Sequence, residues 1–258
     1  MIDLKNIFII AKFTFLELYK SKILINIIFL GLGILLVSYL ASQLTHGVPT
    51  RIALDFGLGT LSLSTVGISI FMGANLIQKE LETRTVYMII SKPIKRFYFI
   101  LGKIMGISTI LLINTLILGG ISISFFVFLG GENSFLLFWT IVFIYLGSKI
   151  IFFVAPFFSM LTNTTMTVLY SIIIFILGHA IGSSFSLPLI QKNPILFKLL
   201  QFYSYFFPDL SKLNIKDFVI YQQSLPGEFI QGVLIYGFTY CIMLILLLFL
   251  IFERKDLD

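Results

Sequence analysis

Two ionisable side chains interrupt long apolar stretches of the sequence, where they could do chemistry away from water. Lys149 lies within Phe135 to Ser159, and His179 lies within Met166 to Ser184. A charge at the centre of a bilayer costs at least about 2.5 to 3.5 kcal/mol, so an intramembrane cation is a functional hypothesis by default. Lys149 could face a polar path or an anionic headgroup, with Asp55 as a possible partner, or its stem could reach the interface. His179 could relay protons, bind a ligand or simply pack.

Serine chemistry is a further possibility. Ser69, Ser108 and Ser122 each follow the dipeptide Gly-Ile. A nucleophilic serine needs a base within hydrogen-bond reach, and His179 could be that base in an intramembrane serine protease. The single cysteine, Cys241, can build neither a disulfide framework nor a thiolate cluster within one copy of the chain, and a lone histidine makes no metal site.

The most charged stretch of the chain, Gln78 to Lys103, nevertheless keeps amphipathic order. A helix is predicted from Glu80 to Ile90, where Glu80 and Arg84 have the i,i+4 spacing of a helical pair. Pro93 ends this helix, because the residue before a proline avoids helical geometry, and a second, basic helix is predicted to begin near Lys95. Such a segment can dock a soluble partner, or it can be a charged loop that only enforces topology.

These side chains must be positioned by membrane helices, because the composition excludes a soluble domain. Of 258 residues, 58% are hydrophobic and only 12% are charged, and the mean hydropathy is +1.04. About 20 apolar residues cross a bilayer, and six such runs predict an all-α integral membrane bundle with six transmembrane helices. The runs are Ile23 to Leu44, Phe56 to Ile77, Ile104 to Leu129, Phe135 to Ser159, Met166 to Ser184 and Phe229 to Phe252, with a turn at Thr162 to Thr165.

The distribution of Lys and Arg orients these spans. Basic residues gather before the first run, between the second and third runs, and after the last run, so both termini are predicted to be cytoplasmic. Residues 1–22 are predicted to form an amphipathic interfacial helix, with an extension of the first span as the alternative. Residues 185–228, which contain four prolines, are predicted to form an outer loop with short helices. Because the cations lie beside apolar runs, the net charge of +6 does not predict a nucleic-acid partner.

Two pairs of glycines have the spacing that lets membrane helices approach closely. They are Gly102 with Gly106, and Gly178 with Gly182. Small residues four positions apart are typical of tight helix contacts in membranes, so each pair is a weak indication of a dimer interface.

A longer motif runs through the charged segment: E-x-E-T-x-T-x-x-x-I-x-S-K-P-x-x-R-x-x-x-x-x-G-K. It is carried by Glu80, Glu82, Thr83, Thr85, Ile89, Ser91, Lys92, Pro93, Arg96, Gly102 and Lys103. This pattern resembles the permease subunits of the ABC type-2 transporter family and, within that family, those that serve the maturation of nitrous oxide reductase. The resemblance extends over most of the chain, including Phe207 to Leu210 and Phe252 to Asp256.

The resemblance implies a single transmembrane permease domain, residues 1–258, in a bacterial inner or plasma membrane. Residues 79–103 would be the cytoplasmic coupling segment, which sits in a groove of a separate ABC ATPase. The residues that would couple to the ATPase are Glu80, Glu82, Thr83, Arg84, Thr85, Ser91, Lys92, Pro93, Arg96 and Lys103. The turn at Thr162 to Thr165 lacks the basic residue expected in many relatives, which leaves a second coupling contact in doubt.

The partners implied are ABC ATPase subunits, a second permease copy or paralogue, and membrane lipid. ATP and Mg²⁺ would belong to the ATPase, since this chain contains no Walker-type phosphate loop and is expected to hold no cofactor and to be no enzyme. A secondary transporter or a channel is the alternative, because such proteins also carry intramembrane ionisable residues. The family resemblance favours an exporter.

Overall fold

The computed structural model describes residues 2–20, 49–82, 96–132, 134–185, 187–221 and 225–254, and the scattered positions 29, 31–33, 36–37 and 39–40. Every regular element in these parts is a helix. The elements are α1 (Ile2–Lys20), α3 (Pro49–Glu82), α5 (Arg96–Phe128), α6 (Phe135–Ser159), α7 (Thr164–Phe185), α8 (Pro188–Lys192), α9 (Pro194–Phe206), the 3₁₀ helix η1 (Leu210–Leu213), α10 (Lys216–Ile220) and α11 (Gly227–Arg254).

Five of the described helices are long and apolar enough to cross a membrane. They are Thr50–Leu76 of α3, Phe97–Phe128 of α5, Phe135–Ser159 of α6, Thr164–Phe185 of α7 and Gly227–Glu253 of α11. The chain therefore has the build of an all-α, multi-pass membrane protein, as its composition predicts. The first predicted span, Ile23 to Leu44, lies largely outside the described residues.

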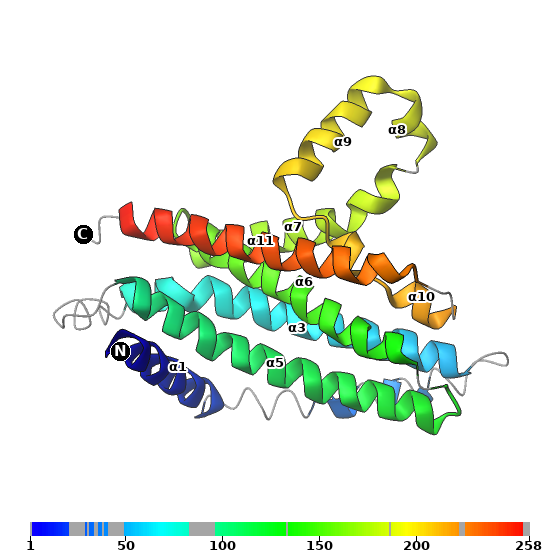
Figure 1. Ribbon diagram of the computed structural model, residues 1–258, viewed down its shortest axis with the longest axis horizontal. Coiled ribbons are helices and arrows are strands. Elements are labelled where there is room, and N and C mark those ends of the chain that lie inside the picture. Colours follow the sequence, from blue (N-terminus) through cyan, green and yellow to red (C-terminus); the bar gives the residue numbers. More distant parts are fainter. Residues whose placement is uncertain are drawn as a thin grey trace.

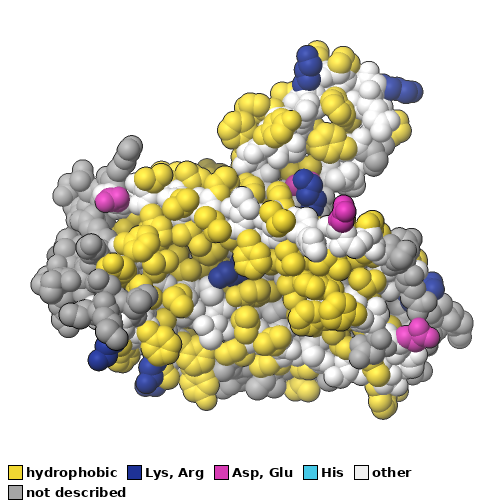
Figure 2. All heavy atoms as spheres, in the orientation of Figure 1, with side chains coloured by type: hydrophobic (Ala, Val, Ile, Leu, Met, Phe, Trp, Pro, Cys, Tyr) yellow, Lys and Arg dark blue, Asp and Glu magenta, His cyan; other side chains and the backbone are white. Residues whose placement is uncertain are grey.

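The long helices lie beside one another in an elongated bundle (Figure 1). At one end of the bundle α3 ends, α5 begins and α11 ends, and α1 lies beside α5 there; α3 begins at the opposite end. The two helices α8 and α9, residues 188–206, project sideways from the bundle and are called the arm below. Figure 2 shows hydrophobic side chains over much of one face of the bundle and on the arm, as a lipid-facing surface requires.

Helix α3 lies at the centre of the bundle, between α5 and α6. A Cβ placed on Gly73 would lie 2.7 Å from the Cβ of Ala155 and 2.8 Å from the carbonyl oxygen of Phe152, so glycine lets α3 and α6 touch. On the other side of α3, the side-chain amide of Asn114 donates to the hydroxyl of Thr65 at 3.1 Å. Both polar residues are buried, and their bond joins α5 to α3 inside the apolar interior.

The observed bounds confirm the fourth predicted span and lengthen the second and third. Helix α6 spans Phe135–Ser159, preceded by a cap in which the Ser134 hydroxyl accepts from the backbone N–H of Leu136. By contrast, α3 starts at Pro49 and runs to Glu82. The helix predicted to begin at Glu80 therefore has no break before it, because residues 80–82 continue α3. Helix α5 begins at Arg96, close to the predicted second basic helix.

The first glycine pair, Gly102 and Gly106, contacts α1 of the same chain. A Cβ on Gly102 would lie 2.7 Å from the Cβ of Ile10, and one on Gly106 would lie 2.7 Å from the carbonyl oxygen of Ala11. Helix α1 thus runs in the same direction as α5 and packs along it, with Ile7 and Thr14 buried. A helix that lies flat on the membrane surface would cross a membrane-spanning α5 at a steep angle, whereas α1 packs along α5. The placement of residues 1–22 at the membrane interface therefore stays a prediction. The contact with α1 also replaces the dimer contact expected at Gly102 and Gly106.

The second glycine pair receives the segment that returns from the arm, residues 207–215. A Cβ on Gly178 would lie 2.7 Å from the carbonyl oxygen of Pro208, and one on Gly182 would meet the side chain of Ser211. Leu210, Leu213 and Ile215 of this segment are buried in the bundle. The return segment is therefore part of the core, and it fills the groove on α7 that the glycine spacing had suggested for a second copy.

Candidate functional site

The residues predicted to couple to an ATPase fall at one end of the bundle, where only their flanks are described. Glu80 and Glu82 belong to the last turn of α3, and Arg96 is the first residue of α5, but the side chains of all three lie outside the described residues. Lys103 is described, and its Nζ lies 5.2 Å from the centre of the Phe99 ring. Also outside the described residues are Thr83, Arg84, Thr85, Ser91, Lys92 and Pro93.

The helix that leaves this segment is held firmly at its start. Phe97, in the first turn of α5, packs against Phe249 near the end of α11, with ring centres 4.3 Å apart. Five to nine residues later, α5 makes the close contact with α1 at Gly102 and Gly106. The first three turns of α5 therefore contact both α11 and α1.

Lys149 lies between α6 and α5, in a cage of aromatic rings. Its ammonium donates to the hydroxyl of Ser108 on α5. The same Nζ lies 5.1 Å from the ring centre of Phe153, and 5.8 Å from those of Tyr145 and Phe152. Such rings stabilise a cation through the negative potential on their faces. The hydroxyl of Tyr145 also donates to the backbone carbonyl of Ser108, at 3.4 Å, so this cage ties α6 to α5.

The expected partner of Lys149 is engaged elsewhere. Asp55, near the start of α3, forms an ion pair with Lys216 of α10. Among the described residues, no carboxylate forms an ion pair with Lys149. The sequence suggested Asp55 because it is an acidic residue at the outer end of the second predicted span. It could not show that Lys216 of α10, which follows the return segment, lies beside Asp55.

His179 lines a different space, a cavity of about 400 Å³ between α3, α6, α7 and the return segment. The cavity wall is mostly apolar, and its polar side chains are Ser62, Ser148, His179, Asn214 and Lys216. The Nδ1 of His179 lies 3.1 Å from the backbone carbonyl oxygen of Phe175, one turn earlier in α7. The structure thus separates the two intramembrane candidates: His179 faces this cavity, and Lys149 faces α5.

The three serines considered as nucleophiles do not meet His179. The hydroxyls of Ser69 and Ser122 donate to backbone carbonyls of their own helices, Thr65 and Leu118, at 2.8 and 2.9 Å. Ser108 is bonded to Lys149 and to the carbonyl of Ile104. A serine–histidine pair of the kind that a serine protease needs is therefore not assembled from these residues.

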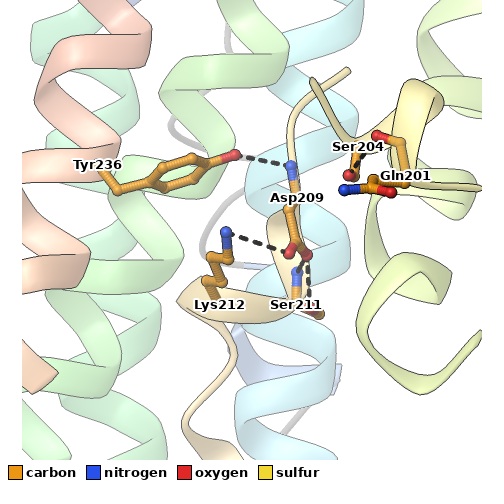
Figure 3. Close-up of polar contacts among 6 residues, drawn as sticks. All are labelled: Gln201, Ser204, Asp209, Ser211, Lys212 and Tyr236. Carbon is orange, nitrogen blue, oxygen red and sulfur yellow. Dashed lines mark hydrogen bonds and ion pairs between the residues drawn. The ribbon is translucent and has the colours of Figure 1, made fainter. Parts of the chain in front are cut away.

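A polar cluster that the sequence did not single out as a site lies where the arm joins the bundle (Figure 3). The carboxylate of Asp209 accepts from the backbone N–H and the hydroxyl of Ser211, at 3.2 and 2.5 Å, and lies 3.6 Å from the ammonium of Lys212. The backbone N–H of Asp209 donates to the hydroxyl of Tyr236 on α11, at 2.7 Å. Tyr240 donates to the carbonyl of Phe206, at 3.0 Å, and completes the attachment of the arm to α11.

Tyr203 stacks on Phe207 at the base of the arm, with ring centres 4.5 Å apart. Burial raises the pKa of Tyr203 above its usual value, because the phenolate would lose hydration there. Its hydroxyl is buried without a hydrogen-bond partner in the described parts of the protein. The only sequence signal for this region was the stretch Phe207 to Leu210, which resembles the same permease family.

Within the described residues, no group of three or more His, Cys, Asp or Glu side chains could hold a metal ion. A scan against protein-family models and a search of curated proteins returned no match to this chain.

Proposed function

We propose that this chain is the permease subunit of an ATP-driven exporter of the ABC type-2 class, with ATP and Mg²⁺ bound by separate ATPase subunits. The observation that supports this proposal most directly is that the charged residues 83–95 connect the end of α3 to the start of α5. Helix α3 continues six residues past its apolar span Thr50–Leu76 to Glu82, about 9 Å at the rise of a helix. After 13 further residues, α5 begins at Arg96 at the same end of the bundle.

This arrangement supports a coupling role because the charged segment is attached on both sides to helices of the bundle interior. A force on residues 83–95 would act on α3 through a continuous helix and on α5 through its first turn. Helix α3 touches α6 at Gly73, and α5 touches α1 at Gly102 and Gly106. A docked ATPase could therefore move four helices through one segment, which is the mechanical requirement for alternating access.

The sixth span belongs to the same proposal. The described positions between residues 29 and 40 are helical, and Gly31 packs on α5, where an added Cβ would lie 2.8 Å from Ile121. Helix α1 runs from one end of the bundle part of the way toward the other, where α3 begins, so the chain between Lys20 and Pro49 has to cover the remaining length. A membrane span over Ile23 to Leu44 would do this and would leave both termini on one side, the cytoplasmic side in this proposal.

In the proposed cycle, two ATPase subunits close on ATP, and the coupling segments of two permease copies or of a heterodimer move with them. The paired permeases then open toward the outside of a bacterial inner or plasma membrane. Lys149 and the cavity beside His179 are the polar features that a translocation path would use. The aromatic cage holds the Lys149 cation with no ion pair to a carboxylate among the described residues, which would leave it available to an anionic group of the cargo.

The proposal is tested by purifying the tagged chain in mild detergent from cells that express it at its native level. Recovery of an ATPase with a Walker motif is expected. Reversing the charges of Glu80, Glu82, Arg84 and Arg96 together should abolish that recovery without changing membrane insertion. The matched control reverses Lys192 and Lys198 on the arm, which should leave recovery unchanged. Undiminished ATPase binding by the fourfold variant would contradict the proposal.

A secondary transporter is the second candidate, favoured by one observation, the caged cation at Lys149. Ionisable side chains inside a membrane bundle often mark the ion or substrate pathway of a carrier. Recovery of no ATPase, together with ion-dependent flux by the chain alone in liposomes, would support this candidate instead.

A further inference from the structure

A cleft of about 790 Å³ separates the arm from the side of the bundle. Its floor is the exposed side of α11, where Gly232, Ile235 and Met243 lie. Its other walls are the base of the arm, where Tyr205 lies, and the polar cluster of Figure 3, with Asp209 and Lys212. The cleft therefore has one long apolar wall and one short polar end.

The contact of the polar end with Tyr236 of α11 indicates how deep in the membrane this end lies. The candidate span Gly227–Glu253 has 27 residues, about 40 Å of helix, whereas the hydrocarbon layer is about 30 Å thick. Tyr236, which holds Asp209, is nine residues or about 14 Å from Gly227. If all of the excess, about 10 Å, protrudes at the Gly227 end, Tyr236 lies about 4 Å inside the hydrocarbon boundary, within reach of the glycerol and phosphate groups of lipids.

Of the two paired charges in the polar cluster, the cation is the more exposed. The carboxylate of Asp209 is only 11% exposed and is already held by Ser211, whereas the side chain of Lys212 is 55% exposed. The separation of 3.6 Å between Asp209 and Lys212 is longer than a charge-assisted hydrogen bond, so the ammonium keeps donors for another partner. Lys212 also lies 5.0 Å from the centre of the Tyr236 ring, which holds it at the polar end of the cleft.

The outer surface of the arm fits the same environment. Leu189, Ile195, Phe202 and Phe206 are largely exposed, and the described arm carries Lys192 and Lys198 but no acidic residue. Exposed aliphatic and aromatic side chains with lysines are typical of helices that lie in the boundary layer of an anionic membrane. An arm in this layer would place the cleft within the reach of lipid but away from bulk water.

We propose that this cleft binds a glycerophospholipid of the surrounding leaflet, with its phosphate on Lys212 and an acyl chain along Ile235, Thr239 and Met243 of α11. The phosphate would give the Lys212 ammonium a second anionic partner beside Asp209, and Tyr205 and Tyr236 offer ring faces and hydroxyls at headgroup level. The acyl chain covers the exposed apolar wall. This site is independent of ATPase docking, since it lies on the arm and α11 and uses none of the residues 79–103.

Three probes separate the chemistry of such a ligand in titrations of the delipidated, detergent-solubilised chain, followed by native mass spectrometry. They are dioleoylphosphatidylglycerol, dioleoylglycerol, which has the same chains without the phosphate, and inorganic phosphate. Phosphatidylglycerol is expected to bind at least about tenfold more tightly than dioleoylglycerol, since a charge-assisted contact is lost. Inorganic phosphate at equal concentration should not displace it.

Two variants test the two ends of the cleft. Lys212→Met should weaken phosphatidylglycerol at least about tenfold and leave dioleoylglycerol unchanged. Gly232→Trp should block the outer end of the cleft without disturbing the fold, because an added Cβ at Gly232 meets no neighbour among the described residues. The matched controls are Lys198→Met on the arm and Gly120→Trp on α5, another glycine with open space around its Cβ.

Loss of phosphatidylglycerol in both cleft variants, with binding retained in both controls, would support the site. Wild-type affinity in Lys212→Met and Gly232→Trp would overturn it. Equal affinity for dioleoylglycerol would overturn the role of the phosphate, and displacement by inorganic phosphate would overturn the assignment to a lipid. None of these readouts depends on an ATPase, so the failure of this inference is distinguishable from the failure of the proposed function.

Discussion

The ammonium of Lys149 donates to the hydroxyl of Ser108 and so links α6 to α5 inside the bundle. Because the described residues offer this cation no carboxylate, the hydroxyl and the aromatic rings around it replace the hydration that the cation would have in water. The stability of the bundle should therefore depend on Ser108 in a way that a lone helical serine does not explain.

Ser108→Ala is expected to lower the free energy of unfolding by about 1 to 3 kcal/mol, because it leaves the partly buried ammonium of Lys149 without its hydroxyl acceptor. Thermal unfolding of the purified chain in detergent measures the change. Thr109→Ala is the matched control, since this neighbouring hydroxyl is exposed and bonds only to the carbonyl of Met105 in its own helix. Equal stability of the two variants would show that the contact with Lys149 contributes nothing.

Lys149→Met should leave the bundle as stable as the original protein or more stable. The substitution keeps the apolar stem between the rings and removes a charge whose burial is costly. Adding Lys149→Met to Ser108→Ala should also recover most of the stability lost in Ser108→Ala, because the orphaned charge is gone. The same unfolding assay measures both variants. A double variant less stable than Ser108→Ala alone would contradict this account of the cage.

Leucine at Gly102 or at Gly106 should separate α1 from α5. Either side chain would overlap Ile10 or Thr14 of α1, and overpacking of this kind typically costs about 1 to 3 kcal/mol. Gly120→Leu on the same helix should be neutral, because its added Cβ meets no neighbour among the described residues. Thermal unfolding of the three variants is the measurement. Unchanged stability at Gly102 and Gly106 would show that α1 does not hold this position.

Asp55 should be coupled in energy to Lys216 and not to Lys149. A double-mutant cycle with Asp55→Asn and Lys216→Met is expected to give a coupling of up to about 1 kcal/mol, a modest value because Asp55 is 54% exposed and its charge is screened. The parallel cycle with Asp55→Asn and Lys149→Met should give a coupling near zero. The reverse order of the two couplings would restore the pairing that the sequence suggested.

The membrane class and the individual helices follow from local sequence, and the contacts between them do not. The bounds of α6 were predictable because its apolar run is closed by the cap at Ser134 and by the turn after Ser159. The extension of α3 to Glu82 was not, because a helix continues wherever its backbone hydrogen bonds are satisfied, even after the apolar run ends. The length of an apolar run therefore predicts the part of a helix that crosses the membrane, but not the full length of the helix.

The site residues show the same division. Lys149 stands out in the sequence because a cation interrupts an apolar run, but its partner Ser108 is one of many serines in membrane helices and carries no signal of its own. The glycine spacing predicted close contacts correctly and their partners wrongly, because the sequence does not say that α1 and the return segment fill those grooves. Long-range pairing, as between Asp55 and Lys216, is set by the path of the chain through the arm.

The central claim is that residues 79–103 dock an ATPase, and site-specific photocross-linking in intact cells tests it most directly. With a benzophenone amino acid in place of Tyr87, irradiation should give a covalent adduct with a Walker-motif ATPase. The same amino acid in place of Phe202 on the arm should give no such adduct. An adduct at Tyr87 alone is the result that this account predicts. No ATPase adduct at Tyr87, with the chain well expressed and inserted, would contradict it.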